Sequence, residues 1–551
     1  MDVGRQKVQG SSEDTLVPPG RPSSPTEEAR RYRRYLLLLI LAFAVLQLVK
    51  SAFMGLHEDE ANWWLQTHFL RAGYFYHPPF VVYEQFLVTR LLGNSHLSLR
   101  VGSLLFTAGI IYLIYRVCLE AFDDHRWAFR ASLVVAVLPI TNYWLMLAIQ
   151  DAPFIFFFLL CALLTLRIVR TGEGRYWYPL GSVAGLMLLC KLQAAFILPS
   201  IFFLLLTSRE QRGWLRRKEP YLAFLMMAAI FTPTLLWYVE RHFEPITYQL
   251  GNRVGFLEFS FLAYLAKALG HVAAEMIVLS PLVYGLSLLG MVYAALAGYR
   301  KRDPRHATYL ALFWLAFPTV LIFTLTGGPP NWAINGHFVA LVASAGALSS
   351  LLPRLRSPFL RRHAAKLLLA LCVVLPLLFT SATLLITVGD RLQNEYRGLA
   401  VYLEQLKEEK GLEDLYVASP YYFVPSEVAY YARGRFRGYT IILQVYEHVV
   451  LSAGDNSYTP WTPEQELLGK DLVFVDCERN PDDFNTPLSY WEEKLPLYFQ
   501  EVEEPLVYTY RKWSDDYRRY YIFFCHGYRG SQAAAWHRGE VREYVEARRS
   551  E

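Results

Sequence analysis

The chain is dominated by apolar segments of about the length that crosses a lipid bilayer, separated by short polar loops. An α-helix needs about 20 apolar residues to span the hydrocarbon core. Of the 551 residues, 54% are apolar and only 19% are charged, too little charge to cover a soluble protein of this length. The sequence therefore predicts a polytopic α-helical membrane protein. The expected transmembrane helices, about eleven in number, lie at approximately 35–54, 98–119, 127–147, 152–170, 177–191, 193–208, 220–239, 272–298, 307–326, 333–352 and 366–388.

Clusters of arginine and lysine indicate which loops face the cytoplasm, because cytoplasmic loops carry an excess of positive charge. The main clusters share a side with the N-terminus only if residues 177–208 cross the membrane twice. They lie at 30–34, 209–218, 299–306 and 353–365. We therefore expect the chain to turn near Lys191, on the side away from the cytoplasm.

The two ends of the chain differ from its middle. Residues 1–29 are rich in Ser, Pro, Gly and Glu and are expected to form a disordered cytoplasmic tail. An uncleaved first helix follows, and residues 30–389 form the predicted membrane domain. Residues 390–551 carry more charge and alternate short β-rich runs with helical patterns, which predicts an extracytoplasmic α/β domain. The expected strands are Leu415–Ala418, Tyr439–Val445, Leu472–Val475 and Leu506–Tyr510, and the expected helices are Gly398–Lys410 and Ser426–Arg433.

The six cysteines form no CxxC pair and suggest neither a zinc knuckle nor a disulfide scaffold. Four of them lie in or beside apolar segments, where they are expected to be small core residues. Cys477 and Cys525 lie in the polar C-terminal part. A disulfide between them and two free thiols both remain open.

Three consecutive carboxylates, Glu58, Asp59 and Glu60, follow the first predicted helix directly. One interpretation is helix capping, because acids favour a helix N-terminus. The other is a general base, since a positioned carboxylate can take the proton of a hydroxyl group as it attacks. Spacing alone does not decide between the two interpretations.

Several other polar residues interrupt apolar segments on the side away from the cytoplasm. Asp151 opens a predicted helix. It is either a plain N-cap or an ionised group at membrane depth, where a charge is costly unless it has a partner or a function. Lys191 either snorkels to the interface or binds an anionic ligand such as a lipid phosphate. His77 and Tyr76 either contact a phosphate or sugar or belong to an interfacial aromatic belt. Arg253 adds positive charge in the loop 240–271.

Asn331 and Trp332 end a Gly-Gly-Pro-Pro turn that could shape a sugar pocket or simply connect two helices. All these candidates fall at one face of the membrane on the predicted topology. That face would hold a base, cations for a phosphate and an aromatic surface for a sugar. Asp59 and Asp151 could also share a divalent cation, but two acids do not make a metal site.

Two segments after the first helix carry a family resemblance. Asp59-Glu60-Ala61-Asn62-Trp63-Trp64, followed by Gly73-Tyr74-Phe75-Tyr76-His77-Pro78-Pro79, resembles the first outer loop of the GT-C membrane glycosyltransferases. The pattern is similar to bacterial members of the dolichyl-phosphate-mannose–protein mannosyltransferase superfamily, including aminoarabinose transferases and protein mannosyltransferases. Further landmarks follow in order: Leu99 to Ser103, Gln150 to Pro153, Gly185 to Lys191, and Pro330 to Trp332.

The resemblance implies a GT-C fold, a polyprenyl-phosphate sugar donor and inverting transfer. It implies that Asp59 is the catalytic base with Glu60 beside it, that Asp151 organises the site and that Lys191 binds the donor phosphate. Aminoarabinose transferases have Lys-Pro-Pro where this chain has His77-Pro78-Pro79. Because a neutral or partly charged His binds phosphate less firmly, this difference favours other branches of the superfamily.

The expected function is transfer of a monosaccharide from a polyprenyl-phosphate donor to an acceptor outside the cytoplasm, at the inner (plasma) membrane. The acceptor is left open between lipid A or lipopolysaccharide, another glycan and a protein. The alternatives are a transporter or flippase of lipid-linked sugars and a non-catalytic membrane scaffold. A transporter is expected to carry charges within several spans and paired halves, and the sequence shows neither.

Overall fold

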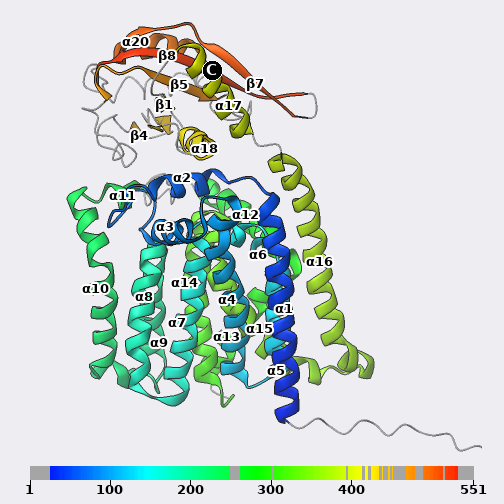
Figure 1. The fold of residues 1–551 in the computed structure, drawn as a ribbon. Helices are drawn as coiled ribbons and strands as arrows, with labels where there is room; N and C mark the ends of the chain where they lie inside the picture. The colour runs from blue at the N-terminus through cyan, green and yellow to red at the C-terminus, as the bar shows by residue number, and fades with distance from the viewer. Residues whose placement is uncertain are drawn as a thin grey trace, which may run out of the picture.

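The protein is described by a computed structural model, which shows a helical bundle covered at one end by a small sheet (Figure 1). The described residues are 25–248, 261–300, 303–392 and 395–411, together with shorter stretches of the C-terminal part. Those stretches are 416–419, 423–432, 437–438, 445–446, 449–450, 467–477, 488–512 and 515–530. Arg253 and most of the expected strand Tyr439–Val445 lie outside the described residues.

Apolar helices of differing length form the bundle (Figure 1). They are α1 (Pro25–Phe53), α4 (His96–Phe122), α5 (His125–Val137), α7 (Asp151–Thr171), α8 (Trp177–Cys190), α9 (Ile197–Thr207), α10 (Glu219–Glu240), α12 (Phe261–Leu279), α13 (Pro281–Arg300), α14 (His306–Thr326), α15 (Ile334–Leu351) and α16 (Pro358–Leu392). Short elements join them: α6 (Pro139–Asn142), η1 (Trp144–Met146), η2 (Gly174–Tyr176), η3 (Leu192–Phe196), η4 (Arg212–Arg216), α11 (Glu244–Tyr248), η6 (Pro330–Trp332) and η7 (Leu352–Arg354). Among the described residues, seven helices are long and apolar enough to cross a membrane, or eight if one bent pair counts as a span.

The expected helix at 127–147 is broken rather than straight. α5 ends before Leu138, whose backbone is extended, and α6 restarts with Pro139 at its first position. Pro disfavours the helical conformation in the residue before it, so the break lies where the sequence places that proline. The two pieces meet at 62°. The expected helix at 272–298 is interrupted in a similar way at Ser280, a non-glycine residue with a φ of 68°.

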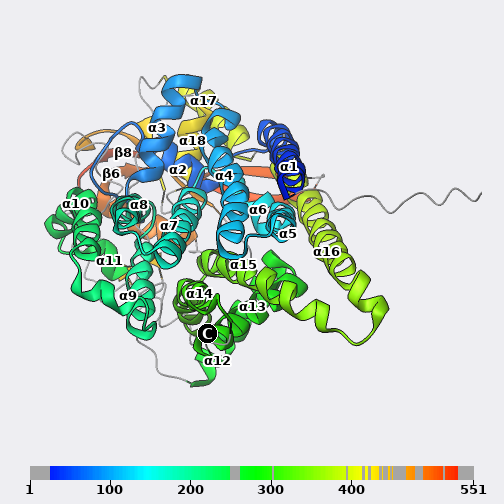
Figure 2. The same cartoon turned by 90° about the horizontal axis from the view of Figure 1, so that it is seen from below.

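Residues 177–208 form two helices, as the charge pattern predicted. α8 ends at Cys190, Lys191 is extended, and α9 begins after the short helix η3. Seen along the bundle, α8 and α9 occupy different positions (Figure 2). Each has fewer than 18 residues, the minimum length for the seven long spans, so two short helices lie where two crossings were predicted. The prediction of a disordered tail at residues 1–29 needs one correction, because residues 25–29 already belong to α1.

Two further helices, α2 (Glu58–Gln66) and α3 (Phe80–Leu92), lie across the end of the bundle that the sheet covers (Figure 1). α3 begins right after Pro78-Pro79 and ends at Gly93, whose φ is 78°. Gly adopts such positive φ values at no steric cost and often ends a helix.

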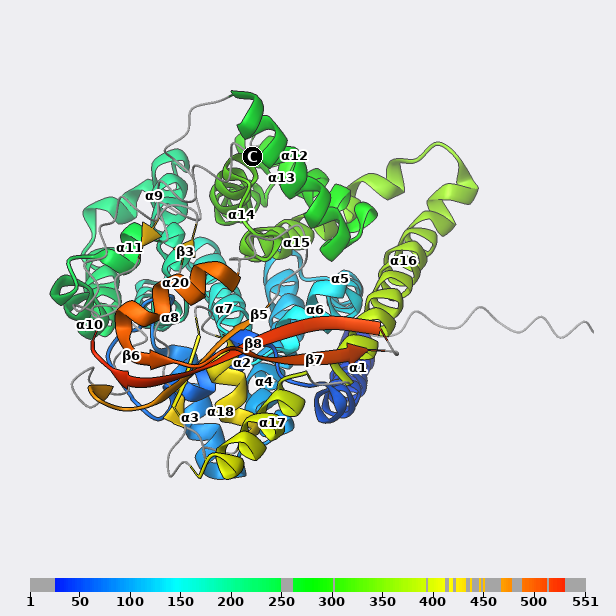
Figure 3. The ribbon, with the colours of Figure 1, turned by 90° about the horizontal axis from the view of Figure 1, so that it is seen from above.

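The C-terminal part forms a six-stranded mixed sheet in the order β2-β1-β5-β8-β6, with β7 also paired to β8. Its strands are β1 (Tyr416–Ala418), β2 (Arg437–Gly438), β5 (Leu472–Cys477), β6 (Phe499–Val502), β7 (Leu506–Lys512) and β8 (Asp515–Tyr528). A separate pair joins β3 (Val445–Tyr446) to β4 (Val449–Val450), and the helices are α17 (Glu395–Glu409), α18 (Phe423–Tyr431) and α20 (Leu488–Tyr498). Seen from above, the sheet crosses over α2, α3 and α4, with α18 beneath it (Figure 3).

Strands β1, β5 and β7 and helices α17 and α18 lie where the sequence predicted them. β8 was not among the predicted strands, although it pairs with β5, β6 and β7 and holds the sheet together. β5 and β8 are antiparallel, with Leu472 opposite Cys525 and Cys477 opposite Tyr520. The two cysteines therefore lie at opposite ends of the ladder, and both are buried free thiols.

Candidate active site

Helix α2 is held at its start by reciprocal hydrogen bonds. His57 is the N-cap residue, and its Nδ1 accepts a hydrogen bond from the Asp59 backbone N–H at 3.2 Å. The Glu60 carboxylate accepts from the His57 backbone N–H at 2.8 Å. This arrangement is a capping box in which His replaces the usual Ser or Thr. The cap is thus His57, and Asp59 lies within the first turn of the helix.

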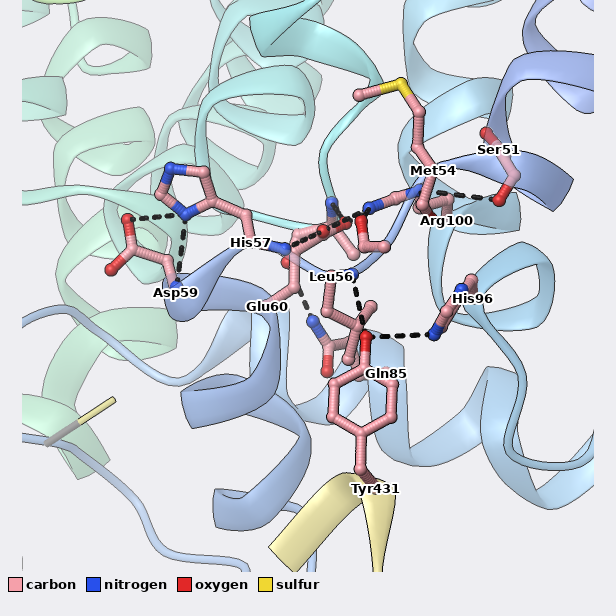
Figure 4. Close-up of polar contacts among 12 residues, drawn as sticks. Ser51, Met54, Leu56, His57, Asp59, Glu60, Gln85, His96, Arg100 and Tyr431 are labelled. Carbon is pink, nitrogen blue, oxygen red and sulfur yellow. Dashed lines mark hydrogen bonds and ion pairs between the residues drawn. The ribbon is translucent and has the colours of Figure 1, made fainter. Parts of the chain in front are cut away.

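Glu60 points into the protein and forms a fully buried ion pair with Arg100 of α4 (Figure 4). Arg100 Nε and Nη2 donate to the two carboxylate oxygens at 2.7 and 2.5 Å, and the Ala148 N–H donates at 2.8 Å. Burial alone raises the pKa of a carboxyl group, but the charge and hydrogen bonds of Arg100 outweigh it and lower the pKa of Glu60 to about 2. Glu60 therefore ties α2 to α4 and to the loop before α7.

Asp59 is directed away from this pair. Its carboxylate lies 3.8 Å from His57 Nδ1, and 34% of its side chain is exposed. Figure 4 shows Asp59 and His57 on one side of Glu60 and Arg100 on the other. Of the two acids predicted to act together, Asp59 is partly exposed, whereas Glu60 is enclosed by protein donors.

Asp151 and Lys191 form a second buried ion pair, 2.9 Å apart. Asp151 opens α7, and Lys191 lies at the turn after α8. Asp151 Oδ1, the oxygen that pairs with Lys191, also accepts a hydrogen bond from Asn331 Nδ2 at 3.0 Å. The other oxygen, Oδ2, accepts a hydrogen bond from Trp144 Nε1 at 3.3 Å. Three residues predicted separately, at positions up to 180 apart in the sequence, are therefore in direct contact.

Aromatic rings border this pair on two sides. The Lys191 ammonium lies 5.4 Å from the centre of the Trp332 ring, a cation–π distance. On the other side, the Trp144 ring lies edge-on to the His57 ring at 5.8 Å. The contacts therefore run without a break from Asp59 through His57 and Trp144 to the Asp151–Lys191 pair.

His77 and Tyr76 lie in the adjoining wall. Gln150, the residue before Asp151, donates from Nε2 to His77 Nε2 at 2.9 Å. Since this nitrogen accepts a hydrogen bond, the His77 ring is neutral in this arrangement. Tyr76 is buried in an apolar cluster that includes Trp63 and is packed against Trp144. His77 thus contributes a neutral polar group beside the ion pair.

The structure brings Asp59, Glu60, Asp151, Lys191 and the turn residues to one end of the bundle (Figure 1). Within the described part of the chain, no group of three or more His, Cys, Asp or Glu side chains is arranged to hold a metal ion. Both oxygens of Asp151 already accept hydrogen bonds from protein donors, which makes this carboxylate a poor free ligand.

Sequence reasoning missed the partners of the predicted residues. Arg100 was noted only as part of a family landmark, although an arginine within an apolar segment indicates a buried ion pair. His57 and Trp144, which join Asp59 to Asp151, carried no distinct signal. Gln150 directly precedes Asp151 in the sequence, and this adjacency was the only indication that Gln150 lies at the site.

Comparisons with known proteins identify a family and relatives to which this chain is similar. Residues 76–237 match the family of dolichyl-phosphate-mannose-protein mannosyltransferases. A lipid A galacturonosyltransferase, RgtD of Rhizobium johnstonii, is 24% identical over 384 residues, which make up 66% of this chain and 75% of that relative.

Solved structures match over a larger share of the chain. The crystal structure of ArnT from Cupriavidus metallidurans bound to undecaprenyl phosphate has a TM-score of 0.57 at 14% sequence identity, covering 89% of this chain and 98% of that one. The apo state of ArnT gives a TM-score of 0.56 at 13% identity over the same shares. At this level of identity the likeness establishes the fold.

Proposed function

Since the chain has the GT-C fold and its sequence is similar to glycosyltransferases of that superfamily, we propose that it transfers a monosaccharide from a polyprenyl-phosphate donor to an acceptor on the extracytoplasmic side of the inner membrane. The observation that carries the proposal is the contact of Asp151, Lys191 and Asn331 beside the His57–Asp59 pair. A sugar-phosphate substrate needs a base and a cation in that proximity.

Asp59 is the general base in this mechanism. A base must come within hydrogen-bonding distance of the proton that it takes, and the partly exposed Asp59 carboxylate can do so. Glu60 cannot, because Arg100, Ala148 and His57 occupy its oxygens. Glu60 therefore positions the first turn of α2, and Asp59 with it.

Lys191 stabilises the leaving group. The acceptor hydroxyl attacks the anomeric carbon, a new C–O bond forms, and Asp59 takes the hydroxyl proton. The bond between the anomeric carbon and the phosphate oxygen breaks, and its electron pair stays on that oxygen. Lys191, oriented by Asp151 and Asn331, offers positive charge where negative charge develops. A single displacement of this kind inverts the anomeric configuration.

The remaining candidates supply binding surface. Trp332 and Tyr76 offer aromatic surface to the sugar, and the neutral His77 offers a hydrogen bond to the donor. Arg253 is proposed to add positive charge near the phosphate. The named activity of RgtD makes lipid A the first acceptor to test, with other glycans and proteins as further candidates. No metal is required by these steps.

Replacing Asp59 with Asn tests the base. Loss of a general base typically costs about 10²–10⁴-fold in rate, so D59N should fold and bind donor but transfer little sugar. The measurement is release of free polyprenyl phosphate from labelled polyprenyl-phosphate sugars by purified protein, with a lipid A acceptor present. A transporter or a scaffold would release none.

Glu58→Gln is the matched control, because Glu58 is another carboxylate of the same helical turn. This variant should retain most of the wild-type rate. Near-normal transfer by D59N, or equal loss of transfer in both variants, would rule out Asp59 as the base. The absence of any product from the wild-type protein with every donor and acceptor class would rule out the proposed transfer itself.

A further inference from the structure

A second buried polar cluster lies behind the turn that carries Asn331 and Trp332. Its members are His271 and Glu275 on α12, Ser287 on α13 and His337 on α15, and all four are buried. None of them belongs to the proposed catalytic residues. They connect three helices to the segment Gly327–Gly328, which opens the turn.

Polar contacts run through the cluster from the turn to α13: hydrogen bonds at Gly328 and Ser287, and close approaches of both imidazoles to Glu275. His271 Nδ1 bonds to the carbonyl oxygen of Gly328, and its Nε2 lies 3.2 Å from Glu275 Oε1. His337 Nε2 lies 3.0 Å from the same oxygen. At its other nitrogen, His337 contacts Ser287 Oγ at 2.8 Å.

The partners determine where the imidazole protons lie. A carbonyl oxygen can only accept, so His271 carries a proton on Nδ1. Ser287 Oγ donates to the Tyr284 carbonyl at 2.7 Å and therefore accepts from His337 Nδ1. Nε2 of each ring faces the Glu275 carboxylate, which only accepts when ionised, so these contacts are hydrogen bonds when the ring also carries a proton on Nε2. Each ring is fixed in orientation by its partner at the opposite nitrogen.

The turn itself needs an external support. Gly327 has a φ of 66°, and Gly328 follows it, so two residues without side chains open the segment. Glycine loses the most conformational freedom on ordering, which makes the turn costly to hold in one conformation. Gly327 also lies directly against α12, because a Cβ atom there would be 2.6 Å from Lys267 Cβ.

We propose that His271 is a positioning residue for the glycosyl transfer, held by Glu275 and His337, and that it tethers Gly328 so that Asn331 stays in contact with Asp151. The inference rests on the proposed function of the site in front of the turn. Asn331 follows Gly328 by three residues and donates to the Asp151 oxygen that also pairs with Lys191. A displaced turn would therefore leave Lys191 less well oriented toward the donor phosphate.

Two isosteric variants of His271 separate the tether from general stability. In H271N the amide nitrogen takes the place of Nδ1 and can still donate to Gly328. In H271Q the amide reaches the place of Nε2 and keeps only the contact with Glu275. A misplacement of about 1 Å can cost as much as about 10²-fold in rate, so H271Q should lose about 10- to 100-fold in kcat while H271N stays within about threefold of wild type.

Amide hydrogen exchange of a peptide covering residues 326–334 provides a readout independent of activity. Exchange should be faster than wild type in H271Q and close to wild type in H271N. Ser344→Ala on α15 is the control, because its buried hydroxyl bonds only to the Leu341 carbonyl of its own helix in the contacts described. This control should change neither kcat nor exchange at the turn.

Equal kcat values and equal exchange in H271N and H271Q would overturn the proposal. If H271Q does not fold, Glu275→Gln gives a second test, since it removes the charge that orients both rings while keeping His271. Faster exchange at 326–334 in Glu275→Gln supports the tether, and unchanged exchange overturns it. If the wild-type protein transfers no sugar, the proposed function fails while the exchange contrast still tests the tether.

Discussion

The Asp151–Lys191 pair shows how much a single residue can depend on its partner. Both side chains are almost fully buried, and two charges are removed from water at once. Such a pair contributes little net stability compared with apolar residues, but removing one member leaves an uncompensated buried charge. Asn331 and Trp144 both donate hydrogen bonds to Asp151 and so hold the pair in place.

Lys191→Met and Asp151→Asn should each destabilise the protein by about 3–5 kcal/mol, whereas the double variant should recover most of that loss. Transfer should be lost in Lys191→Met and should not return in the double variant, because the cation is still missing. Thermal unfolding in detergent and the product-release assay measure the two effects separately.

Arg217→Met is the control for this series. Arg217 pairs with Glu219 in an exposed loop at the start of α10. An exposed pair is worth at most about 1 kcal/mol, so the melting temperature should barely change. A double Asp151/Lys191 variant less stable than both single variants would contradict the interpretation of the pair as a buried, mutually dependent unit.

At the scale of elements, α3 carries an acid that the proposed mechanism does not use. Both carboxylate oxygens of Glu84 are buried and have no hydrogen-bond partner among the described residues. They pack against Gly102 of α4, where a Cβ atom would be 1.6 Å from Glu84 Oε1. Burial raises the pKa of Glu84 to about 8. A side chain at position 102 would therefore displace the buried carboxyl end of Glu84.

The direction of the pH effect follows from this pKa. Between the ordinary value of 4.5 and about 8, the folded state keeps the Glu84 proton and the unfolded state has lost it. Stability from this group therefore falls as the pH rises through that window. Glu84→Gln removes the dependence, so its melting temperature should exceed that of wild type by more at pH 8 than at pH 5.

Glu492→Gln is the matched control for Glu84, because Glu492 is an exposed residue of α20. The difference between this variant and wild type should be the same at both pH values. A Glu84→Gln variant whose difference from wild type does not grow with pH would contradict a buried, protonated Glu84.

At the scale of the whole molecule, the C-terminal part docks directly on the helix that carries Asp59. Tyr431 of α18 accepts a hydrogen bond from the Leu56 N–H at 3.2 Å and contacts His96 Nε2 at 3.2 Å (Figure 4). Tyr430 packs edge-on against Trp64 of α2, with ring centres 5.1 Å apart. Because Leu56 directly precedes the cap residue His57, this contact supports the start of α2.

Tyr431→Phe should lower stability by about 1–3 kcal/mol, because it removes the acceptor from the Leu56 N–H. Amide exchange at residues 54–60 should become faster, and transfer should fall as the first turn of α2 loosens. Tyr430→Phe is the control, since it keeps the ring that packs on Trp64. Equal exchange at 54–60 in the two variants would show that the Tyr431 hydroxyl does not support α2.

The sequence alone determined which end of the bundle each candidate residue occupies. A residue at a helix end has its side of the membrane set by the number of crossings before it, and the apolar runs and basic clusters supplied that number. This is why Asp59, Asp151, Lys191 and Asn331 were expected at one face, and why the two short helices α8 and α9 were anticipated on either side of Lys191.

Only the tertiary structure decided which of these residues touch. Contacts depend on the rotation of each helix about its axis and on breaks such as the bend at Pro139, and neither follows from counting crossings. Glu60 was predicted to act in catalysis beside Asp59, but the first turn of α2 directs its side chain to Arg100 instead. Likewise the run of strand-forming residues at 520–524 does not show that β8 pairs with β5, β6 and β7, because those partners are distant in the sequence. Sequence sets the level of a side chain along the membrane normal, whereas packing sets the direction in which it points.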